Sequence, residues 1–293
     1  MKEKMLNHLS SFFKKILLLI LLCVIPVAAI SEESRVELIE TNWSFDGIFG
    51  TFDRSSLQRG YQVYQEVCSG CHSVQHLSYR NLHEPGGPEF SKEEAKAIAS
   101  QFEIIDGPNS EGEMFTRQAR LSDKFVKPYP NIEASTSANG GAYPPDMSVL
   151  AKARAGGADY IYSLLLGYEE PPQGFELDDG VYYNKYMLGK KIKMSSPLME
   201  GIVEYSDGTE ASIEQMSKDI TTFLVWSSEP HLEAQHKMGF KTIIYLIILL
   251  SLVYLSKKKV WSRYDKNKEE EDPFDKVEKI VTKYEGENPK SFK

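Results

Sequence analysis

The feature that most constrains this chain is a pentapeptide, Cys-Ser-Gly-Cys-His at residues 68–72. Two cysteines separated by two residues and followed directly by a histidine are typical of the attachment site of a c-type haem. Each thiol can bond to one vinyl group of the haem, and the imidazole of His72 then lies beneath the iron as an axial ligand. We therefore expect Cys68, Cys71 and His72 to form one half of a haem site, around which the rest of the chain must fold.

Two other interpretations of the pentapeptide have less support. A structural zinc ion takes four ligands and usually uses a second Cys or His pair at similar spacing, whereas this chain has three cysteines in all. A thioredoxin-like redox pair is expected in a βαβ setting and gives no role to a histidine directly after the second cysteine. The sequence therefore predicts one covalently bound haem c.

The first 29 residues have the pattern of an export signal. Lysines precede an apolar run over residues 16–30, and the small residues that end at Ala29 match a signal-peptidase cleavage site. One alternative is a retained membrane helix, for which the run is short. Another is a lipoprotein anchor at Cys23, which follows a leucine rather than a small residue. Cleavage after Ala29 would remove Cys23 and leave only the two cysteines of the pentapeptide.

A second apolar stretch predicts a single transmembrane helix over residues 238–256, and three consecutive lysines follow it. Because the cytoplasmic flanks of membrane helices carry an excess of Lys and Arg, the lysines place the C-terminal side in the cytoplasm. A buried core helix is the alternative, which the lysine run disfavours. The expected organisation is a signal peptide at 1–29, an exported haem domain at 30–237, the transmembrane helix at 238–256 and a charged cytoplasmic tail at 257–293.

The exported part is strongly acidic. Residues 30–237 contain 32 acidic and 18 basic residues, a net charge of −14, whereas the whole chain has a formal net charge of −8. An acidic surface speeds encounters with a basic soluble partner, although acidity can equally serve only to keep the domain soluble. The few basic residues are not interleaved with an aromatic stacking platform, which argues against binding to nucleic acid.

The exported part is predicted to be mainly helical with long loops. Five segments have the start signals or the apolar periodicity of helices. They are 55–74, 91–102, 147–155, 159–167 and 213–226. In the first of them, Tyr61 and Tyr64 share a face with both cysteines, so the haem is expected to attach to a buried face. The loops around the second helix, within 84–141, are long enough to wrap a haem, and residues 175–193 are expected to be irregular with short strands.

The second axial position of the iron decides between classes of function. An open position binds small ligands, whereas a second protein ligand makes an electron carrier. Spacing alone does not choose among the methionines and histidines of the exported part. They are Met114, Met147, Met187, Met194, Met199, Met216, His76, His83, His231 and His236.

Seven runs of residues carry a resemblance to a known family. They are Trp-Ser-Phe-Asp-Gly at 43–47, Gln-Arg-Gly-Tyr-Gln-Val-Tyr at 58–64, Asp-Gly-Pro at 106–108, Gly-Glu-Met-Phe at 112–115, Lys-Pro-Tyr-Pro-Asn at 127–131, Gly-Ala-Tyr-Pro-Pro-Asp at 141–146 and Gly-Gly-Ala-Asp-Tyr at 156–160. In this order they closely resemble the cytochrome c1 family, the haem-bearing subunits of ubiquinol–cytochrome c oxidoreductase (bc1) complexes. The resemblance implies a mainly α domain, similar to a class I cytochrome c with long loop insertions, and one C-terminal transmembrane helix.

The resemblance also implies the remaining contacts of the haem. The family's sixth ligand is a methionine in a loop ahead of a proline, which corresponds to Met194, so His72 and Met194 are the expected iron ligands. Arg154 corresponds to a propionate partner, a role that suits its fixed fork of donors. Tyr160 is expected near the haem and Asn139 in a loop beside it.

Two positions depart from the family pattern. The family commonly has paired asparagines ahead of its Gly-Ala, and here Gly140 stands in place of the second. Met147 stands where the family usually has leucine, which places a second thioether near the expected site.

The function that the resemblance implies is respiratory electron transport. The haem would take single electrons from a Rieske iron–sulfur protein and pass them to a cytochrome c, while quinol chemistry occurs in cytochrome b. The chain would be an electron-transfer subunit with no catalytic group of its own, in a bacterial inner membrane with the haem domain in the periplasm. Acidic candidates for docking a basic cytochrome c are Glu169, Glu170, Asp178 and Asp179.

Two alternative functions share the same pentapeptide. A stand-alone, membrane-anchored c-type cytochrome could deliver electrons to a terminal oxidase. A haem-based ligand sensor would leave the sixth position of the iron open.

Overall fold

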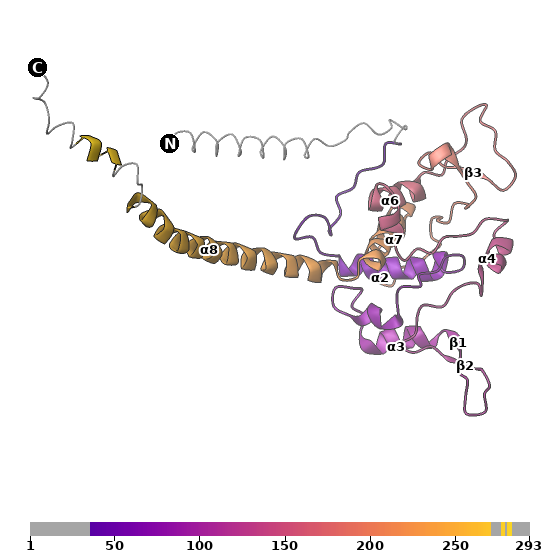
Figure 1. Cartoon of the computed structure of the whole chain (residues 1–293). Coiled ribbons are helices and arrows are strands. Elements are labelled where there is room, and N and C mark those ends of the chain that lie inside the picture. Colours follow the sequence, from indigo (N-terminus) through magenta and orange to yellow (C-terminus); the bar gives the residue numbers. More distant parts are fainter. Residues whose placement is uncertain (1–35, 271–276, 279, 283–293) are drawn as a thin grey trace, which may run out of the picture.

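The computed structural model describes residues 36–270, 277–278 and 280–282 (Figure 1). The predicted signal peptide at 1–29 lies outside these residues, and so does much of the predicted tail. A mainly helical domain occupies the chain up to Pro230, and one long helix leaves it. The predicted fold class, mainly α with long loops and one apolar C-terminal helix, is confirmed.

Two crossing helices form the centre of the domain. α2 covers Arg54–Val63 and α7 covers Ile213–Ser228. They approach closely at Gly60, where a Cβ atom would lie 2.1 Å from the carbonyl oxygen of Asp219. Leu57 of α2 and Phe223 of α7 are fully buried at this crossing. Close packing of this kind leaves the two helices little freedom to move relative to each other.

Local sequence explains where these two helices begin. The side chain of Asp53 accepts a hydrogen bond from the backbone N–H of Ser55, and Ser212 accepts one from Gln215. α2 then continues as a π-helical segment, Tyr64–Cys68, in which the N–H of Ser69 donates to the carbonyl of Tyr64 at 2.8 Å. The helix predicted over 55–74 therefore ends earlier, at the first cysteine, because the chain turns at the Ser-Gly dipeptide.

Several shorter helices lie between α2 and α7 in the sequence. They are η2 (Tyr79–His83), α3 (Lys92–Ser100), α4 (Ile132–Ala138), α5 (Leu150–Ala153), α6 (Gly157–Leu166) and η3 (Leu188–Lys190). α5 and α6 lie against α7. The predicted helices at 91–102, 147–155 and 159–167 are confirmed with shorter or shifted ends, whereas α4 lies in a region expected to be loop.

Two small antiparallel sheets lie within the long loops. β1 (Glu103–Asp106) pairs with β2 (Phe115–Gln118) so that Glu103 faces Gln118, and β3 (Tyr182–Tyr183) pairs with β4 (Lys191–Ile192). The second sheet confirms the short strands expected within 175–193, whereas the first was not predicted. Met194 lies two residues after the end of β4.

A long helix leaves the domain as a separate rod (Figure 1). α8 covers Leu232–Glu270, and its part Leu232–Ser262 is long and apolar enough to cross a membrane. The predicted span at 238–256 lies within it, and the helical conformation continues at both ends. Its apolar side chains from Met238 to Leu255 are exposed in the isolated chain, as expected for a surface that faces lipid.

The first turns of α8 are fixed to the start of α2. The guanidinium of Arg54 donates from Nη1 to Oε1 of Glu233 at 2.8 Å and from Nη2 to Oε2 at 2.9 Å. The backbone N–H of Phe52 donates to the same carboxylate at 3.0 Å, and Nδ1 of His236 lies 3.1 Å from the carbonyl oxygen of Gly50. A bidentate pair at this position orients the root of α8 as well as attaching it.

Candidate cofactor-attachment site

The two cysteines of the pentapeptide lie on the turn that ends the π-helical segment. The carbonyl of Cys68 accepts hydrogen bonds from the backbone N–H groups of Cys71 at 3.1 Å and of His72 at 2.9 Å. Both thiols are free, and Cys68 is partly buried whereas Cys71 is exposed. Burial raises the pKa of the Cys68 thiol to about 12, so it is held as a neutral group beside the core. The turn thus offers one thiol at the core and one at the surface.

The ring of His72 is oriented by a backbone carbonyl from another segment. Its Nδ1 atom lies 2.8 Å from the carbonyl oxygen of Pro145. A carbonyl can only accept a hydrogen bond, so Nδ1 carries the proton and Nε2 has a free lone pair. Burial lowers the pKa of His72, which favours the neutral ring. A neutral imidazole whose second nitrogen is held by a carbonyl is the usual state of a metal ligand.

The segment after His72 is joined to residues 145–148 by several hydrogen bonds. Asp146 accepts from the Ser73 hydroxyl at 2.7 Å and from the backbone N–H groups of Gln75 at 3.0 Å and Ser148 at 2.9 Å. Met147 donates its backbone N–H to the carbonyl of Ser73 at 2.8 Å. Burial opposes the ionisation of Asp146, but hydrogen bonds from Ser148 and Ser73 outweigh it and lower its pKa. Asp146 therefore stays charged and holds the two segments together.

Met194 lies after β4 on a segment that meets the same loop. The hydroxyl of Tyr168 donates to the carbonyl oxygen of Met194 at 3.1 Å. The adjacent Lys193 donates from Nζ to the carbonyl of Gly140 at 3.3 Å, and Gly140 lies five residues before Pro145. The Met194 side chain is partly buried. The segments that carry His72 and Met194 are therefore both attached to the loop at 139–148.

The other three residues expected at the site, Asn139, Tyr160 and Arg154, differ in their contacts and in their exposure to solvent. The amide nitrogen of Asn139 donates to the carbonyl of Ser135 at 2.7 Å and so closes the end of α4. The hydroxyl of Tyr160 points to the sulfur of Met187 at 3.5 Å. Arg154 is exposed, and its Nη1 donates to the carbonyl of Ala153 at 3.2 Å. Asn139 thus lies directly before Gly140, whose carbonyl Lys193 contacts. The guanidinium of Arg154 lies at the surface.

The remaining methionine candidates have other environments. Met147 and Met216 pack in the hydrophobic core, with 5% and 0% of their surface exposed. Met114 and Met199 are exposed on the surface at 60% and 61%. Among the described residues, no group of three or more His, Cys, Asp and Glu side chains is placed to hold a metal ion, so this part of the chain does not assemble the donors of a structural zinc site.

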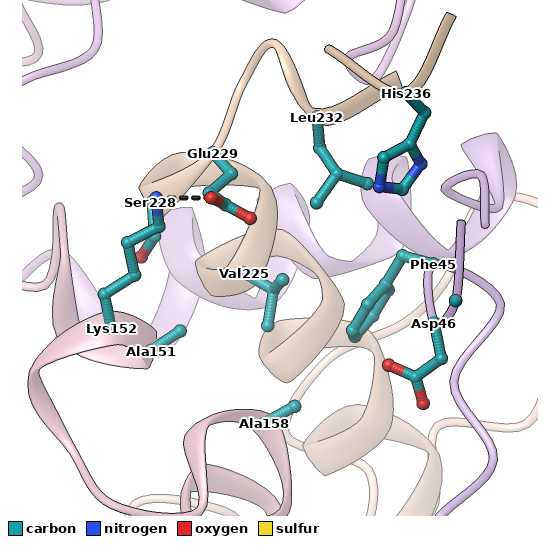
Figure 2. A pocket seen from close by; sticks show the side chains of 11 residues that line it. Phe45, Asp46, Ala151, Lys152, Ala158, Val225, Ser228, Glu229, Leu232 and His236 are labelled. Atoms are coloured by element: carbon teal, nitrogen blue, oxygen red, sulfur yellow. Dashed lines mark ion pairs between the residues drawn. The ribbon is translucent and has the colours of Figure 1, made fainter. Parts of the chain in front are cut away.

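A pocket of about 350 Å³ lies where the domain meets α8 (Figure 2). Phe45 and Asp46 line it from one side, Leu232 and His236 from α8, and Lys152 and Glu229 form an ion pair at its edge. The cysteines and His72 are not part of its lining, so this pocket is separate from the attachment site.

Comparison with known proteins decides the family. The family model of the Cytochrome C1 family matches residues 43–264. The chain belongs to the cytochrome c1 family. The resemblance inferred from its sequence is therefore confirmed, and the match includes the pentapeptide, the loop at 139–148, Met194 and most of α8.

Three relatives show how far the similarity extends. The chain is 47% identical to "Cytochrome b/c1" of Bradyrhizobium diazoefficiens over 239 residues, which is 75% of this chain and 35% of that protein. It is 47% identical to "Cytochrome c1 1, heme protein, mitochondrial" of Arabidopsis thaliana, over 83% of this chain and 78% of the relative. It is 45% identical to "Cytochrome b-c1 complex catalytic subunit, mitochondrial" of Candida albicans, over 79% of this chain and 80% of the relative. The chain thus spans about a third of the first relative and most of the other two.

The donor set fits a covalently attached haem of the kind this family is named for. Two free thiols lie on one turn, and the neighbouring imidazole has its Nδ1 proton engaged and its Nε2 lone pair available. A partly buried thioether lies on a second segment attached to the same loop. These are the donors that c-type attachment and His–Met ligation require.

Three residues of the site were not predicted from the sequence. Pro145 contributes a carbonyl, Asp146 joins two segments, and Tyr168 holds the backbone of Met194. Pro145 and Asp146 lie within one of the runs that carry the family resemblance, which was the available signal. A backbone carbonyl has no side-chain signature, however, so its role becomes visible only in the fold.

Proposed function

We propose that this chain is the cytochrome c1 subunit of a bc1-type respiratory complex and carries single electrons through a covalently bound haem c. The observation that carries the proposal is the oriented, neutral imidazole of His72 on the same turn as two free thiols. When bound, the haem supplies the one-electron chemistry. The chain supplies attachment, orientation, burial and axial ligation, and no side chain has to act as an acid, base or nucleophile.

Cys68 and Cys71 are proposed to attach the haem through thioether bonds, and Nε2 of His72 and the sulfur of Met194 to ligate its iron. The carbonyl of Pro145 keeps the ring of His72 in the tautomer that leaves Nε2 free. A methionine as the second ligand raises the reduction potential relative to a second histidine, which suits transfer toward a high-potential acceptor.

The contacts of Met147 favour Met194 as the second ligand. Met147 is bonded through its backbone to Ser73, directly after His72, and its side chain packs in the core. It therefore belongs to the segment that supports His72, and its side chain is already packed in the core instead of being available to hold an iron. Met194 comes from a separate segment that Tyr168 holds in place.

Arg154, Tyr160 and Asn139 are proposed to complete the haem environment. The exposed guanidinium of Arg154 has donors that can bind a propionate. Tyr160 lies partly buried on α6, and Asn139 ends α4 beside the segment that Lys193 contacts. These roles rest on the family resemblance together with these positions.

The proposed topology places the domain in the periplasm of a bacterium, α8 across the inner membrane and the tail in the cytoplasm. The apolar span of α8 and the three lysines that follow residue 256 support this orientation. In this arrangement cytochrome b and the Rieske protein are the partners within the complex, and a cytochrome c is the electron acceptor.

An acidic loop beside the Met194 segment supports docking of a basic acceptor. Glu169 and Glu170 directly follow Tyr168, which binds the backbone of Met194. Lys191 lies 3.5 Å from Asp178, which is 80% exposed, so this carboxylate is only partly screened. Charge reversal at Glu169, Glu170, Asp178 and Asp179 is expected to slow reduction of a basic cytochrome c at low salt and to have little effect at high salt.

A ligand-replacement experiment tests the proposed function. Absorption spectra of the oxidised and reduced full-length protein are compared with those of Met194→Leu and the matched control Met147→Leu. We expect Met194→Leu to lose the methionine–iron charge-transfer band and to bind carbon monoxide when reduced, whereas Met147→Leu keeps the band and resists carbon monoxide. The reverse pattern would assign the ligand to Met147, and rapid carbon monoxide binding by the unmodified protein would favour a sensor.

A further inference from the structure

A loop at residues 43–51 exposes two large apolar side chains next to the root of α8. Ile48 is 74% exposed and Phe49 is 72% exposed. The tip of this loop, Gly-Ile-Phe-Gly at 47–50, contains no charged residue. In Figure 1 the loop projects from the domain on the side from which α8 leaves it. Neighbouring apolar side chains exposed together in this way mark a surface that binds a partner or a membrane.

The loop has a defined conformation that holds its tip outward. Hydrogen bonds connect Thr51 to Ser44 at 3.0 Å and Gly50 to Gly47 at 3.2 Å, and Gly47 has the positive φ of +76° that the turn requires. The rings of Trp43 and Phe45 stack at 5.5 Å and are buried in the domain. Two aromatic anchors therefore fix the base of the loop, so the exposure of its tip is a property of the fold.

The tip is in contact with the apolar part of α8. The ring of Phe49 lies 6.2 Å from the ring of Phe240 in an edge-on arrangement. One turn earlier, Nδ1 of His236 lies 3.1 Å from the carbonyl of Gly50. Behind the tip, Phe45, Asp46 and Gly47 line the pocket between the loop and α8 (Figure 2). The loop and α8 therefore present one continuous apolar surface at this level.

Helix geometry gives the depth of this contact in a bilayer. At about 1.5 Å per residue, the 19 residues 238–256, whose only charged side chain is the Lys241 ammonium near the domain-side end, span about 28 Å, close to the ~30 Å hydrocarbon core. The whole of this stretch is therefore needed to cross the core. Phe240, two residues from its domain-side end, then lies about 3 Å inside the boundary. A side chain packed on Phe240 is consequently at the edge of the hydrocarbon region.

We propose that the 43–51 loop inserts Ile48 and Phe49 into the membrane leaflet next to the domain, as a second membrane contact beside α8. The occupant of this apolar surface is lipid, because the surface is continuous with the lipid-facing side chains of α8 and its tip lacks charge. Although the root of α8 is fixed to the domain, a single membrane helix lets the domain and the helix tilt and rotate together in the bilayer. A second contact at the same depth fixes which side of the domain faces away from the bilayer.

The proposal is tested by measuring the surroundings of residue 48 in the full-length, haem-loaded chain. A nitroxide is attached to Ile48→Cys in a Cys23→Ser background, and the protein is placed in phosphatidylcholine nanodiscs. Ile105→Cys is the matched control, because Ile105 is 75% exposed but lies on β1, away from α8. Mass measurement checks that each chain carries one nitroxide, as expected when Cys68 and Cys71 are bound in thioethers, and the haem spectrum checks the fold.

Collision rates of the nitroxide with oxygen and with a water-soluble nickel chelate distinguish the outcomes. We expect a severalfold higher oxygen-to-nickel ratio at residue 48 than at residue 105, since oxygen concentrates in lipid and the chelate is excluded from it. Equal ratios at the two positions would overturn the proposal by placing the loop in water. Low rates with both reagents at residue 48 would also overturn it, because they would show contact with protein instead of lipid.

Discussion

The Nδ1 atom of His72 lies 2.8 Å from the carbonyl oxygen of Pro145, a residue 73 positions later in the chain. This contact decides which ring nitrogen carries the proton and which is free for a metal. The state of the proposed iron ligand therefore depends on the placement of the 145–148 segment. Asp146, which joins that segment to the residues after His72, becomes a positioning residue for the site.

Replacing Asp146 by asparagine tests this dependence. The substitution converts one accepting oxygen into an NH₂ group, so at least one of the hydrogen bonds from Ser73, Gln75 and Ser148 is lost. We expect Asp146→Asn to lower the free energy of unfolding by about 1–3 kcal/mol, measured by denaturant titration. Asp178→Asn is the control, since Asp178 is 80% exposed. Equal stability of the two variants would show that Asp146 does not hold these segments together.

Substitution of the buried carboxylate of Asp219 is expected to lower the free energy of unfolding strongly. It accepts from Nε of Arg59 at 2.8 Å, from Nη2 at 3.1 Å and from the hydroxyl of Ser56 at 2.6 Å, and it is fully buried. Asp219→Asn leaves the guanidinium of Arg59 without its buried partner, for which we expect a loss of roughly 3–5 kcal/mol in unfolding free energy.

The control for Asp219→Asn uses the same arginine. Asp207 also pairs with Arg59, at 2.8 Å, but its side chain is 42% exposed. Exposed pairs contribute little, so Asp207→Asn is expected to cost far less than Asp219→Asn. Similar urea midpoints for the two variants would mean that burial does not distinguish the two ion pairs.

The stability contribution of Asp207 has a defined pH dependence. Hydrogen bonds from Thr209 and Arg59 lower the pKa of Asp207 from 3.8 to about 2. Because the pKa is lower in the folded state, the contribution is complete above about pH 4 and is lost as the pH falls toward 2. The difference in unfolding free energy between the unmodified protein and Asp207→Asn should therefore shrink over this range in acid denaturant titrations. A difference that grows on acidification would contradict the assignment.

The close crossing of α2 and α7 predicts the effect of adding one methyl group. At Gly60 a Cβ atom would meet the carbonyl oxygen of Asp219 at 2.1 Å and the Cβ of Phe223 at 2.8 Å. We expect Gly60→Ala to force the helices apart and lower the free energy of unfolding by roughly 1–3 kcal/mol. At Gly239 of α8 nothing lies within 4 Å of the added atom, so Gly239→Ala should leave thermal stability unchanged or raise it. A neutral Gly60→Ala would show that the crossing is more adaptable than its contacts indicate.

The sequence predicted those parts of the fold that depend on local patterns. Apolar spacing and caps located α3, α5, α6 and α7, and hydropathy located the apolar part of α8. The predicted helix before the pentapeptide ended too late, because the apolar spacing continues to Cys71 whereas the chain turns at the Ser-Gly dipeptide. α4 and the β1–β2 hairpin were missed, since their short polar sequences have little periodicity.

The part of the candidate site that is formed by residues close together in the sequence was predictable. Cys68, Cys71 and His72 lie within five consecutive residues, and their spacing alone indicates a haem. The contacts that orient this segment are distant in the sequence: Pro145 is 73 positions from His72, and Asp146 is 73 positions from Ser73. Only the folded chain brings such pairs together, and for Pro145 the contributing atom belongs to the backbone.

The joint between Arg54 and Glu233 has a consequence for how electrons could reach the proposed haem. Arg54 begins the helix whose π-helical continuation ends at Cys68, so one rigid rod of about 20 Å connects the root of the membrane anchor to the attachment turn. A redox group held at the end of such a rod stays at a fixed distance from the root of the membrane anchor. In the proposed function, therefore, electron donor and acceptor must both come to the attachment turn, because the turn has no hinge of its own within this rod.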